Sequence, residues 1–284
     1  MFNCFKKKES YPFNNKIKPE NYNFNIQNFN PLLLKKGNIS ETLTICINDK
    51  KYICKKYQKL YTKEYRNEIH ILKNIYSITY FPCFFKNLVD VNFRYILYQY
   101  IEGIPLSEFN DIVNFKIDDD LYIKQIIYQI TDALHCLLQF NFVYLNLKPD
   151  NIIMLNHKPA SIKLIDLKYC ENIVNKNNKP FRNYGYCAPE IVFQKKYYHN
   201  TDVWSLGCII YYIITKSHLF YQRKQDYFYQ LLDFSEFNKV YIESHHISFF
   251  AFNIIYTCLS PIHILRPSLL DIKKLLNKTK QQIT

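Results

Sequence analysis

The spacing of apolar residues changes once along this 284-residue chain, and that change limits the folds it can adopt. Between about residue 30 and residue 100, apolar and polar residues alternate, as in Thr42–Cys46, Tyr52–Lys56 and Phe93–Tyr100. A two-residue period is typical of half-buried strands. One stretch, Lys63–Tyr76, has helical spacing instead. The first third of the chain is therefore predicted to be rich in strands and to contain one helix.

Beyond residue 104 the apolar residues recur every three or four positions, which is typical of helices. The run Trp204–Ile214 is apolar on nearly every side, so we expect a buried central helix there. Ser268 precedes Leu269 and Asp271 in a pattern that starts a last helix. The fold class predicted from these patterns is α+β, with a smaller strand-rich region before a larger helical one.

Glycine is scarce, because only Gly37, Gly103, Gly185 and Gly207 occur in the whole chain. An average chain has about 7% glycine. In a chain with so few glycines, each one is expected to mark a place where the backbone requires glycine. Gly37 follows the possible strand Leu32–Leu34, and Gly103 closes the apolar strand near residue 100.

The chain carries 37 Lys and Arg against 24 Asp and Glu, a net charge of +13. These basic residues are scattered among many Asn, Ile, Tyr and Phe, a bias typical of an AT-rich genome. No stripe of basic and aromatic residues occurs, so we expect no specific nucleic-acid partner. The 48% of hydrophobic residues excludes disorder as the main state.

The nine cysteines stand singly, without a C-x-x-C pair. This usage favours reduced thiols over structural zinc or a disulfide framework, and with it an intracellular protein, cytoplasmic or nuclear. The N-terminus lacks an apolar signal region, and no segment approaches the roughly 18 to 20 apolar residues of a membrane span. We therefore expect no transmembrane segment.

Four short motifs follow one another in a fixed order: Tyr144–Asn151 (YLNLKPDN), Leu164–Leu167 (LIDL), Ala188–Glu190 (APE) and Asp202–Gly207 (DVWSLG). In this order and spacing the chain resembles the eukaryotic protein kinase family, over residues of about 32 to 280. The resemblance implies a bilobal kinase fold. We expect a polar extension over residues 1–30, a β-rich N-lobe with one helix over 31–100, and a mainly helical C-lobe over 101–280.

Several residues match the family's nucleotide-binding positions. Lys55 (in YICK) matches the lysine that neutralises the α and β phosphates. Its expected partner is Glu68, with Glu64 as the alternative one helical turn earlier. Read without the motif, Lys55 would be a solvated strand lysine, as Lys56 is expected to be. The nucleotide is ATP in this family.

The hinge residues Gln99, Tyr100 and Ile101 match the backbone that meets adenine, and Tyr98 matches the position that closes the back pocket. The family's glycine-rich loop corresponds to residues 37–44 (GNISETLT), which keep only Gly37 and include the branched Ile39 and the acidic Glu41. Glycines allow the backbone to approach phosphates closely. ATP affinity is therefore expected to be weakened.

Asn151 and Asp166 match the family's two Mg²⁺ ligands, with oxygen atoms that suit this cation. The plain alternatives are a loop Asn and a turn-forming Asp. The D-F-G motif reads Asp166–Lys168 (DLK). We expect that Lys168 can pair with Asp166 and compete with Mg²⁺.

The phosphoryl-transfer positions are altered. Asn146 stands where the family has its catalytic aspartate, and an amide cannot act as a base. Lys148 matches the lysine that steadies the transferred phosphoryl group. Asn183 replaces a threonine that contacts the catalytic aspartate, and Leu145 replaces an arginine that pairs with a phosphorylated activation segment. Residues 166–190 contain no Ser or Thr, so activation by Ser/Thr phosphorylation there is not expected.

Three further positions match structural landmarks of the family. Glu190 and Arg266 match a buried ion pair in the lower lobe, and Asp202 is expected to hold the backbone of the catalytic loop.

Three functions remain open at this point. The preferred one is a catalytically impaired kinase domain, a pseudokinase, that binds Mg·ATP weakly and acts through a protein partner or substrate. The second is an active Ser/Thr kinase that tolerates Asn146, since positioning and metal ions supply much of the catalysis. The third is an interaction module that binds no nucleotide.

Overall fold

In the computed structural model the described residues are 26–112, 120–156, 161–174, 183–220, 223–232 and 249–278. They form two compact units. The first comprises the described residues up to Glu102 together with Asp166–Tyr169, and the second comprises Gly103–Ile165 and the described residues from Cys170 onward. The sequence predicted the boundary between residues 100 and 101, two residues earlier than in the structure, and assigned Asp166–Tyr169 to the second region. This short segment returns to the first unit because it packs against the helix there.

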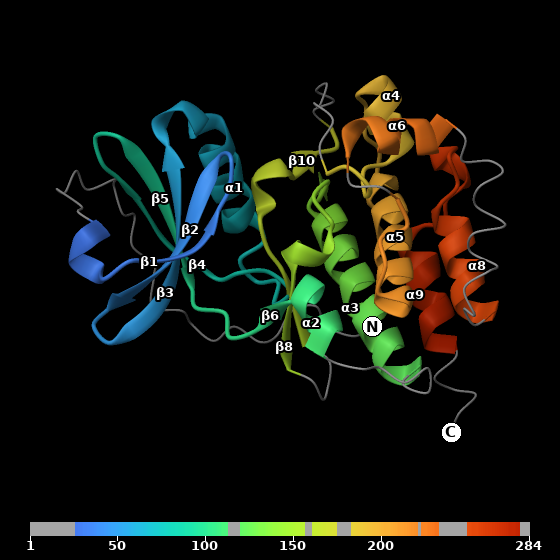
Figure 1. The fold of residues 1–284 in the computed structure, drawn as a ribbon, viewed down its shortest axis with the longest axis horizontal. Coiled ribbons are helices and arrows are strands. Elements are labelled where there is room, and N and C mark those ends of the chain that lie inside the picture. Colours follow the sequence, from blue (N-terminus) through green and yellow to red (C-terminus); the bar gives the residue numbers. More distant parts are fainter. Residues whose placement is uncertain are drawn as a thin grey trace. The chain divides into compact units, whose positions relative to one another are not determined.

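The first unit is built on a five-stranded antiparallel sheet with the strand order β1-β2-β3-β5-β4 (Figure 1). Its strands are β1 (Leu32–Lys36), β2 (Ser40–Ile47), β3 (Lys50–Gln58), β4 (Phe84–Val89) and β5 (Phe93–Gln99). Asn48 and Asp49 join β2 to β3, and both have positive φ, as a two-residue hairpin requires. The pattern analysis missed β4, because its side chains are nearly all partly buried and do not alternate.

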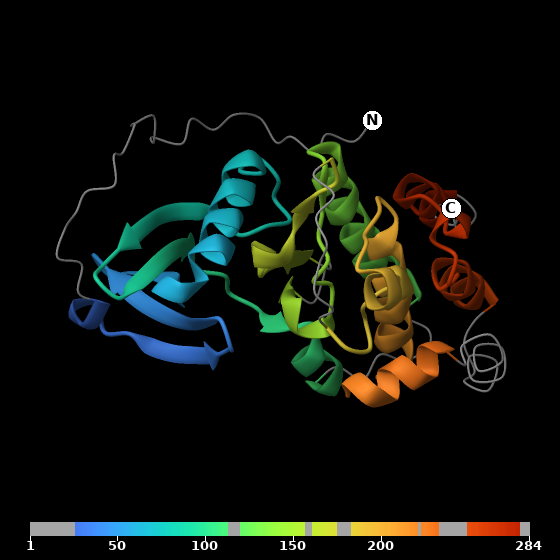
Figure 2. The ribbon, with the colours of Figure 1, turned by 90° about the horizontal axis from the view of Figure 1, so that it is seen from above.

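One helix, α1 (Thr62–Asn74), packs against strands β3, β4 and β5 of this sheet, as Figure 2 shows. The predicted helix Lys63–Tyr76 is thus confirmed with slightly different ends. Short 3-10 turns, η1 (Ile26–Phe29), η2 (Lys59–Tyr61) and η4 (Leu167–Tyr169), complete the unit. Ile26 is buried in a core cluster with residues such as Leu43 and Leu97. The expected extension of residues 1–30 is therefore too long at its end, because Ile26 already belongs to the core.

The second unit is mainly helical. Its helices are α2 (Leu106–Ile112), α3 (Asp120–Gln139), α4 (Pro189–Gln194), α5 (Thr201–Thr215), α6 (Lys224–Leu232), α8 (Phe249–Cys258) and α9 (Leu269–Lys278). Helix α5 lies at the centre, in contact with α3 and α8 (Figure 1). Every residue from Thr201 to Ile213 is buried. The predicted central helix is therefore confirmed, as is the start of α9, where the Asp271 amide donates to the Ser268 hydroxyl at 3.1 Å.

Short strands and turns of the second unit carry the residues of the predicted catalytic loop. The strands are β6 (Ile104–Pro105), β7 (Phe142–Val143), β8 (Ile152–Asn156), β9 (Ser161–Leu164) and β10 (Glu171–Asn172), and the turns are η3 (Pro149–Asn151) and η5 (His263–Leu265). They form two small sheets, β6-β8-β9 and β10-β7. The segment between β7 and η3 holds Asn146 and Lys148.

Two glycines stand where a side chain would collide with its surroundings. A Cβ atom on Gly103 would collide with the carbonyl oxygen of Met154, because β6 lies beside β8. A Cβ atom on Gly207 would stand 2.9 Å from the Cβ of Cys258, at the contact of α5 with α8. These glycines mark close approaches of the backbone, as their scarcity predicts. The predicted α+β class, with a β-rich unit and a larger helical unit, is confirmed.

Candidate active site

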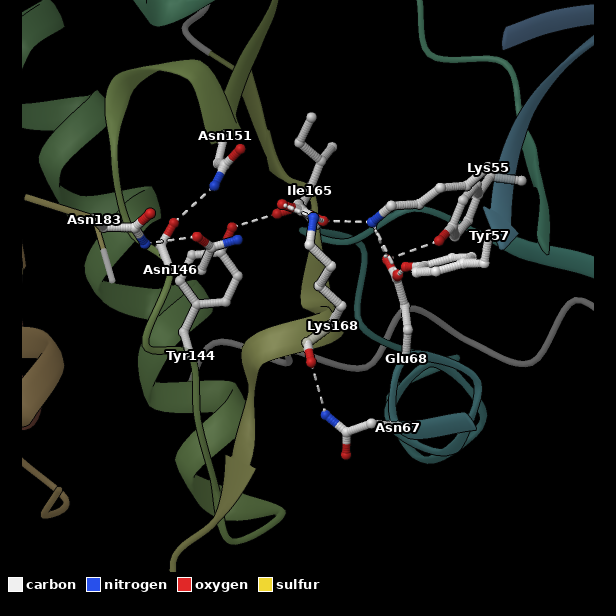
Figure 3. A network of polar contacts seen from close by, with 12 residues as sticks. Lys55, Tyr57, Asn67, Glu68, Tyr144, Asn146, Asn151, Ile165, Lys168 and Asn183 are labelled. Carbon is white, nitrogen blue, oxygen red and sulfur yellow. Dashed lines mark hydrogen bonds and ion pairs between the residues drawn. The ribbon is translucent and has the colours of Figure 1, made fainter. Parts of the chain in front are cut away.

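The centre of the first unit is a buried ion pair between β3 and α1. The Nζ atom of Lys55 lies 3.0 and 2.9 Å from the two carboxylate oxygens of Glu68 (Figure 3). Both side chains are almost fully buried. Glu68, and not the alternative Glu64, is therefore the partner of Lys55. Burial alone lowers the pKa of Lys55, but the carboxylates of Asp166 and Glu68 outweigh it and raise the pKa, so the lysine stays charged.

Two tyrosines also donate hydrogen bonds to Glu68. Tyr57 on β3 donates its hydroxyl to one carboxylate oxygen of Glu68, and Tyr98 on β5 donates to the other at 2.7 Å. Burial and the negative charge of Glu68 raise the pKa of both tyrosines, which therefore remain donors. The sequence singled out Tyr98 only for its size. Tyr57 was missed, since only the strand register brings it to this face of the sheet.

Asp166 lies between two lysines of the same unit. Lys55 forms an ion pair with one of its carboxylate oxygens, and the Nζ atom of Lys168 lies 2.6 and 2.7 Å from the two oxygens. Burial raises the pKa of Asp166, but Lys55 and Lys168 outweigh it and hold that pKa well below its ordinary value. Burial, followed by the charge of Lys55, lowers the pKa of Lys168. The structure thus contains the Lys168–Asp166 pair that the sequence suggested.

The segment that carries Lys168 is fixed through its main chain as well. The side-chain amide of Asn67 on α1 donates to the carbonyl oxygen of Lys168 at 3.0 Å (Figure 3). The turn η4 therefore stays against α1, and the Lys168 side chain is directed at Asp166 from a fixed backbone.

Magnesium prefers oxygen ligands in a near-octahedral arrangement. Asn151 is a buried residue with an amide oxygen, which suits this requirement. Asp166 does not suit it in the same way, since both of its oxygens already bind ammonium groups. A divalent cation about 4 Å from one such ammonium would be repelled by about 8 kcal/mol at an effective dielectric constant of about 20. The residues present therefore do not fit Mg²⁺ at Asp166 while Lys168 is paired with it.

The other predicted nucleotide-binding residues also belong to the first unit. Gly37 lies in the short turn between β1 and β2, where its amide donates to the carbonyl of Ser40 at 3.0 Å. Gln99 ends β5, and its amide is already bound to the carbonyl of Cys83. Tyr100 is 39% exposed and Ile101 is half-buried. The predicted nucleotide contacts of these four residues remain predictions.

The loop after β1 differs from its expected form. Most of the segment expected as a phosphate loop is strand β2, and only residues 37–39 lie between the strands. Glu41 pairs with Lys56 at 3.2 Å, and the ammonium of Lys56 also lies 4.0 Å from the centre of the Phe93 ring. Lys56 is therefore not a freely solvated lysine, because it pairs with the acidic residue of this segment.

Asn146, which stands at the predicted catalytic position, lies in the second unit and accepts hydrogen bonds from two asparagines. The side-chain amide of Asn183 donates to Oδ1 of Asn146 at 2.7 Å, and that of Asn151 donates to the main-chain oxygen of Asn146 at 2.8 Å (Figure 3). Asn146 and Asn151 are both buried. The side-chain oxygen of Asn146 thus accepts a hydrogen bond from a fixed neighbour, and its amide has no basic lone pair to offer.

The backbone of this loop is held by Asp202 of α5. Its carboxylate accepts the amide hydrogens of Tyr144 at 2.6 Å and Leu145 at 2.8 Å. Burial raises the pKa of Asp202 to about 6, against the opposing effect of these two hydrogen bonds. The hydroxyl of Tyr144 donates to the carbonyl of Ile165. Asp202 therefore has the backbone contacts that the sequence predicted for it.

Lys148 lies just beyond Asn146 in the same loop. Its Nζ atom is 3.4 Å from a carboxylate oxygen of Asp150, and both side chains are partly exposed. Lys148 is therefore accessible to solvent. Its predicted contact with a transferred phosphoryl group remains a prediction.

Glu190 and Arg266 form a bidentate ion pair inside the second unit, with distances of 2.8 and 2.7 Å. Thr201 adds a hydrogen bond to Glu190 at 2.8 Å, and the guanidinium of Arg266 lies 5.3 Å from the centre of the Trp204 ring. Both charged side chains are almost completely buried. The pairing that the sequence predicted for these two residues is present.

The segment before Glu190 contains hydroxyls only on tyrosines. Tyr186 is buried, and its hydroxyl bonds to Nδ1 of His218 at 2.6 Å, so it is not accessible for modification. Tyr169 and Tyr184 are half-buried. Residues 175–182 of the segment lie outside the described part of the chain.

The comparisons with known proteins agree with this geometry. A family model described as the protein kinase domain matches residues 36–278. This match covers most of the chain, and the chain therefore belongs to the protein kinase family. Proteins of this family in general bind ATP and Mg²⁺ and act on protein substrates.

Known relatives match part of the chain. It is 32% identical over 176 residues to calcium-dependent protein kinase 6 of Plasmodium berghei, a match that covers 58% of this chain and 12% of the relative. It is 30% identical over 187 residues to a putative serine/threonine-protein kinase of Acanthamoeba polyphaga mimivirus, with 59% of this chain and 65% of the relative covered. The matches thus span less than two thirds of these relatives.

No helix in the described ranges is long and apolar enough to cross a membrane. The eight cysteines of the described ranges are all free thiols.

Proposed function

We propose that this protein kinase domain is catalytically impaired, binds ATP with weakened affinity, and acts through a protein partner. The observation that carries this proposal is the environment of Asn146. Its side-chain oxygen accepts a hydrogen bond from Asn183, where the family has a carboxylate that orients the substrate hydroxyl. Loss of general-base help typically lowers a rate by 10² to 10⁴.

The retained contacts support nucleotide binding. Lys55 and Glu68 form their buried pair, and two tyrosines add hydrogen bonds to it. The hydrogen bonds of Asp202 and the Glu190–Arg266 ion pair stabilise the second unit. A domain that keeps its scaffold and loses its base is suited to a role in binding. Weak affinity for Mg²⁺ and an intracellular location, cytoplasmic or nuclear, are parts of the same proposal.

An active Ser/Thr kinase is the second candidate. It is favoured by the names of the relatives, which are serine/threonine or calcium-dependent protein kinases, and by the accessible Lys148. Positioning and charge neutralisation supply much of the catalysis in this family. An interaction module without nucleotide is the third candidate, favoured by the occupied carboxylate of Asp166.

One experiment separates these candidates. Phosphoryl transfer from labelled ATP to a generic basic protein substrate is measured for the wild type and for Asn146→Asp, with Asn253→Asp as the control. Asn253 is an exposed residue of α8, so this substitution adds the same charge away from the catalytic loop. Binding of ATP is measured in parallel by thermal shift, with Lys55→Ala as the binding control.

We expect ATP binding by the wild type, and faster transfer by Asn146→Asp alone. Measurable wild-type transfer at the rate of Asn146→Asp would establish the active kinase instead. Absence of ATP binding in both the wild type and Asn146→Asp would establish the module without nucleotide.

A further inference from the structure

The first unit contains a positive charge that the family's motif does not provide. Lys168 stands where the D-F-G motif has its glycine, and its ammonium binds both oxygens of Asp166 at 2.6 and 2.7 Å. We infer that Lys168 takes the place of a divalent metal at Asp166, so that this domain binds the phosphates of ATP without Mg²⁺. This inference rests on the proposed function, because it concerns the same nucleotide.

The position of the ammonium is fixed by the protein. Asn67 of α1 holds the main-chain oxygen of Lys168, and Asp166 holds its side chain, which is only 11% exposed. All three residues belong to the first unit. A metal ion must be recruited from solution and must shed water, whereas this cation is already in place.

The hydrogen-bond donors favour Lys168 over Lys55 as the group that contacts phosphate. An ammonium has three N–H groups. Lys55 directs its donors at both oxygens of Glu68 and at Asp166. Lys168 directs two at the oxygens of Asp166, and its ammonium also lies 4.9 Å from the centre of the Tyr169 ring. The third N–H has no hydrogen bond to a carboxylate in the described part of the chain and is the donor available to a phosphate oxygen. The nucleotide can therefore be contacted without breaking the ion pair.

The charge balance points in the same direction. Without Lys168, the charges of Lys55, Glu68 and Asp166 would leave one net negative charge in the cluster, which repels phosphates. Lys168 makes the cluster neutral. It supplies one positive charge where Mg²⁺ supplies two, which agrees with a weakened affinity for ATP.

Equilibrium binding of ATP to the full chain tests this inference. Affinity is measured by titration calorimetry in excess EDTA and again in excess Mg²⁺, for the wild type, Lys168→Met, Lys168→Gly and Lys168→Arg. The control is Lys63→Met, which removes a positive charge from an exposed residue of α1 in the same unit. Thermal unfolding of each variant shows whether it is folded.

The wild type and Lys63→Met are expected to bind ATP in EDTA as tightly, within about twofold, as in Mg²⁺. Lys168→Met should bind at least about tenfold more weakly in EDTA, and Lys168→Arg should retain binding. Lys168→Gly should bind only when Mg²⁺ is present. The wild-type comparison requires no variant and decides the inference even if a variant does not fold.

Other outcomes overturn the inference in distinct ways. Wild-type binding that requires Mg²⁺ would show that Lys168 does not replace the metal, while the proposed nucleotide binding would stand. Tighter binding by Lys168→Met than by the wild type in EDTA would show that Lys168 blocks the site. Absence of ATP binding by the wild type in both conditions would instead remove the nucleotide from the proposed function, and the inference with it.

Discussion

The ammonium of Lys168 lies within 2.7 Å of both carboxylate oxygens of Asp166, two residues earlier in the chain. Lys168 and Asn146 are two departures from the family's motifs that bear on the same reaction. In the proposed function, Asn146 offers no general base, and in the further inference Lys168 supplies a positive charge where a metal ion is otherwise needed. The scaffold around these positions keeps its ion pairs, so its stability can be tested independently of any activity.

The buried pair of Glu190 and Arg266 is predicted to be essential for stability. Arg266→Met should lower the free energy of unfolding by about 3 to 5 kcal/mol, because it leaves the carboxylate of Glu190 buried without its partner. Urea unfolding measures this change. The control is Lys274→Met, since Lys274 pairs with Asp271 at 3.7 Å and both are more than 60% exposed. It should cost less than about 1 kcal/mol, and equal losses for the two variants would contradict the prediction.

The two tyrosines that donate to Glu68 are predicted to stabilise the first unit. Tyr98→Phe and Tyr57→Phe should each lower the free energy of unfolding by about 1.5 to 3 kcal/mol, because each removes a hydrogen bond to a buried charge. The double variant should lose less than the sum, since both bonds end on the same carboxylate. Tyr52→Phe on β3 serves as the control and should change little. Losses no larger than that of Tyr52→Phe would refute this role.

The stability of the second unit should depend on the ionisation of Asp202. Burial raises its pKa to about 6, whereas in the unfolded chain it is about 3.9. The folded state therefore retains a proton that the unfolded state releases. The contribution of Asp202 to stability is largest below about pH 4 and is lost as the pH rises through 6, by up to about 3 kcal/mol.

Asp202→Asn provides the comparison for this pH dependence, because its side chain does not titrate. As the pH rises from 4 to 7, the free energy of unfolding of the wild type should fall relative to that of Asp202→Asn. Urea unfolding at several pH values measures the difference, in which the other titrating groups cancel. A difference that is constant with pH would show that Asp202 does not titrate in this range.

Two cysteines on neighbouring strands are predicted to differ in reactivity. Cys46 on β2 is exposed, whereas Cys54 on β3 is buried and burial raises its pKa to about 12. The thiolate is the reactive form, so about one in 10⁴ of the Cys54 thiols is ionised at pH 8. Iodoacetamide should label Cys46 in the native protein and Cys54 only after unfolding. Peptide mass spectrometry reads both sites, and native labelling of Cys54 at the rate of Cys46 would contradict the burial.

The sequence predicted those parts of the site that have a fixed place in a motif. Lys55, Glu68, Asp202 and the Glu190–Arg266 pair were found because each is defined by its spacing from a recognisable string, and the structure gives them the expected contacts. The pairing of Lys168 with Asp166 was foreseeable because the two are separated by one residue.

Other contacts could not be predicted, because they depend on strand register. Tyr57 contacts Glu68 only because β3 faces α1 at that residue, and Lys56 contacts Glu41 because the two are directly opposite on β3 and β2. Strand β4 was missed because its residues, Phe84–Val89, are mostly half-buried and show no alternation. These features depend on tertiary packing, which no local sequence pattern predicts.

We propose that Asn146 and Lys168 together impair phosphoryl transfer by this kinase domain. The most direct test is single-turnover phosphoryl transfer in Mg²⁺ by the wild type, Asn146→Asp, Lys168→Gly and the variant with both substitutions. Transfer by the double variant should exceed that of the wild type by at least about 10²-fold and should exceed that of either single variant. A double variant that transfers no faster than the wild type would show that the impairment lies elsewhere in the chain.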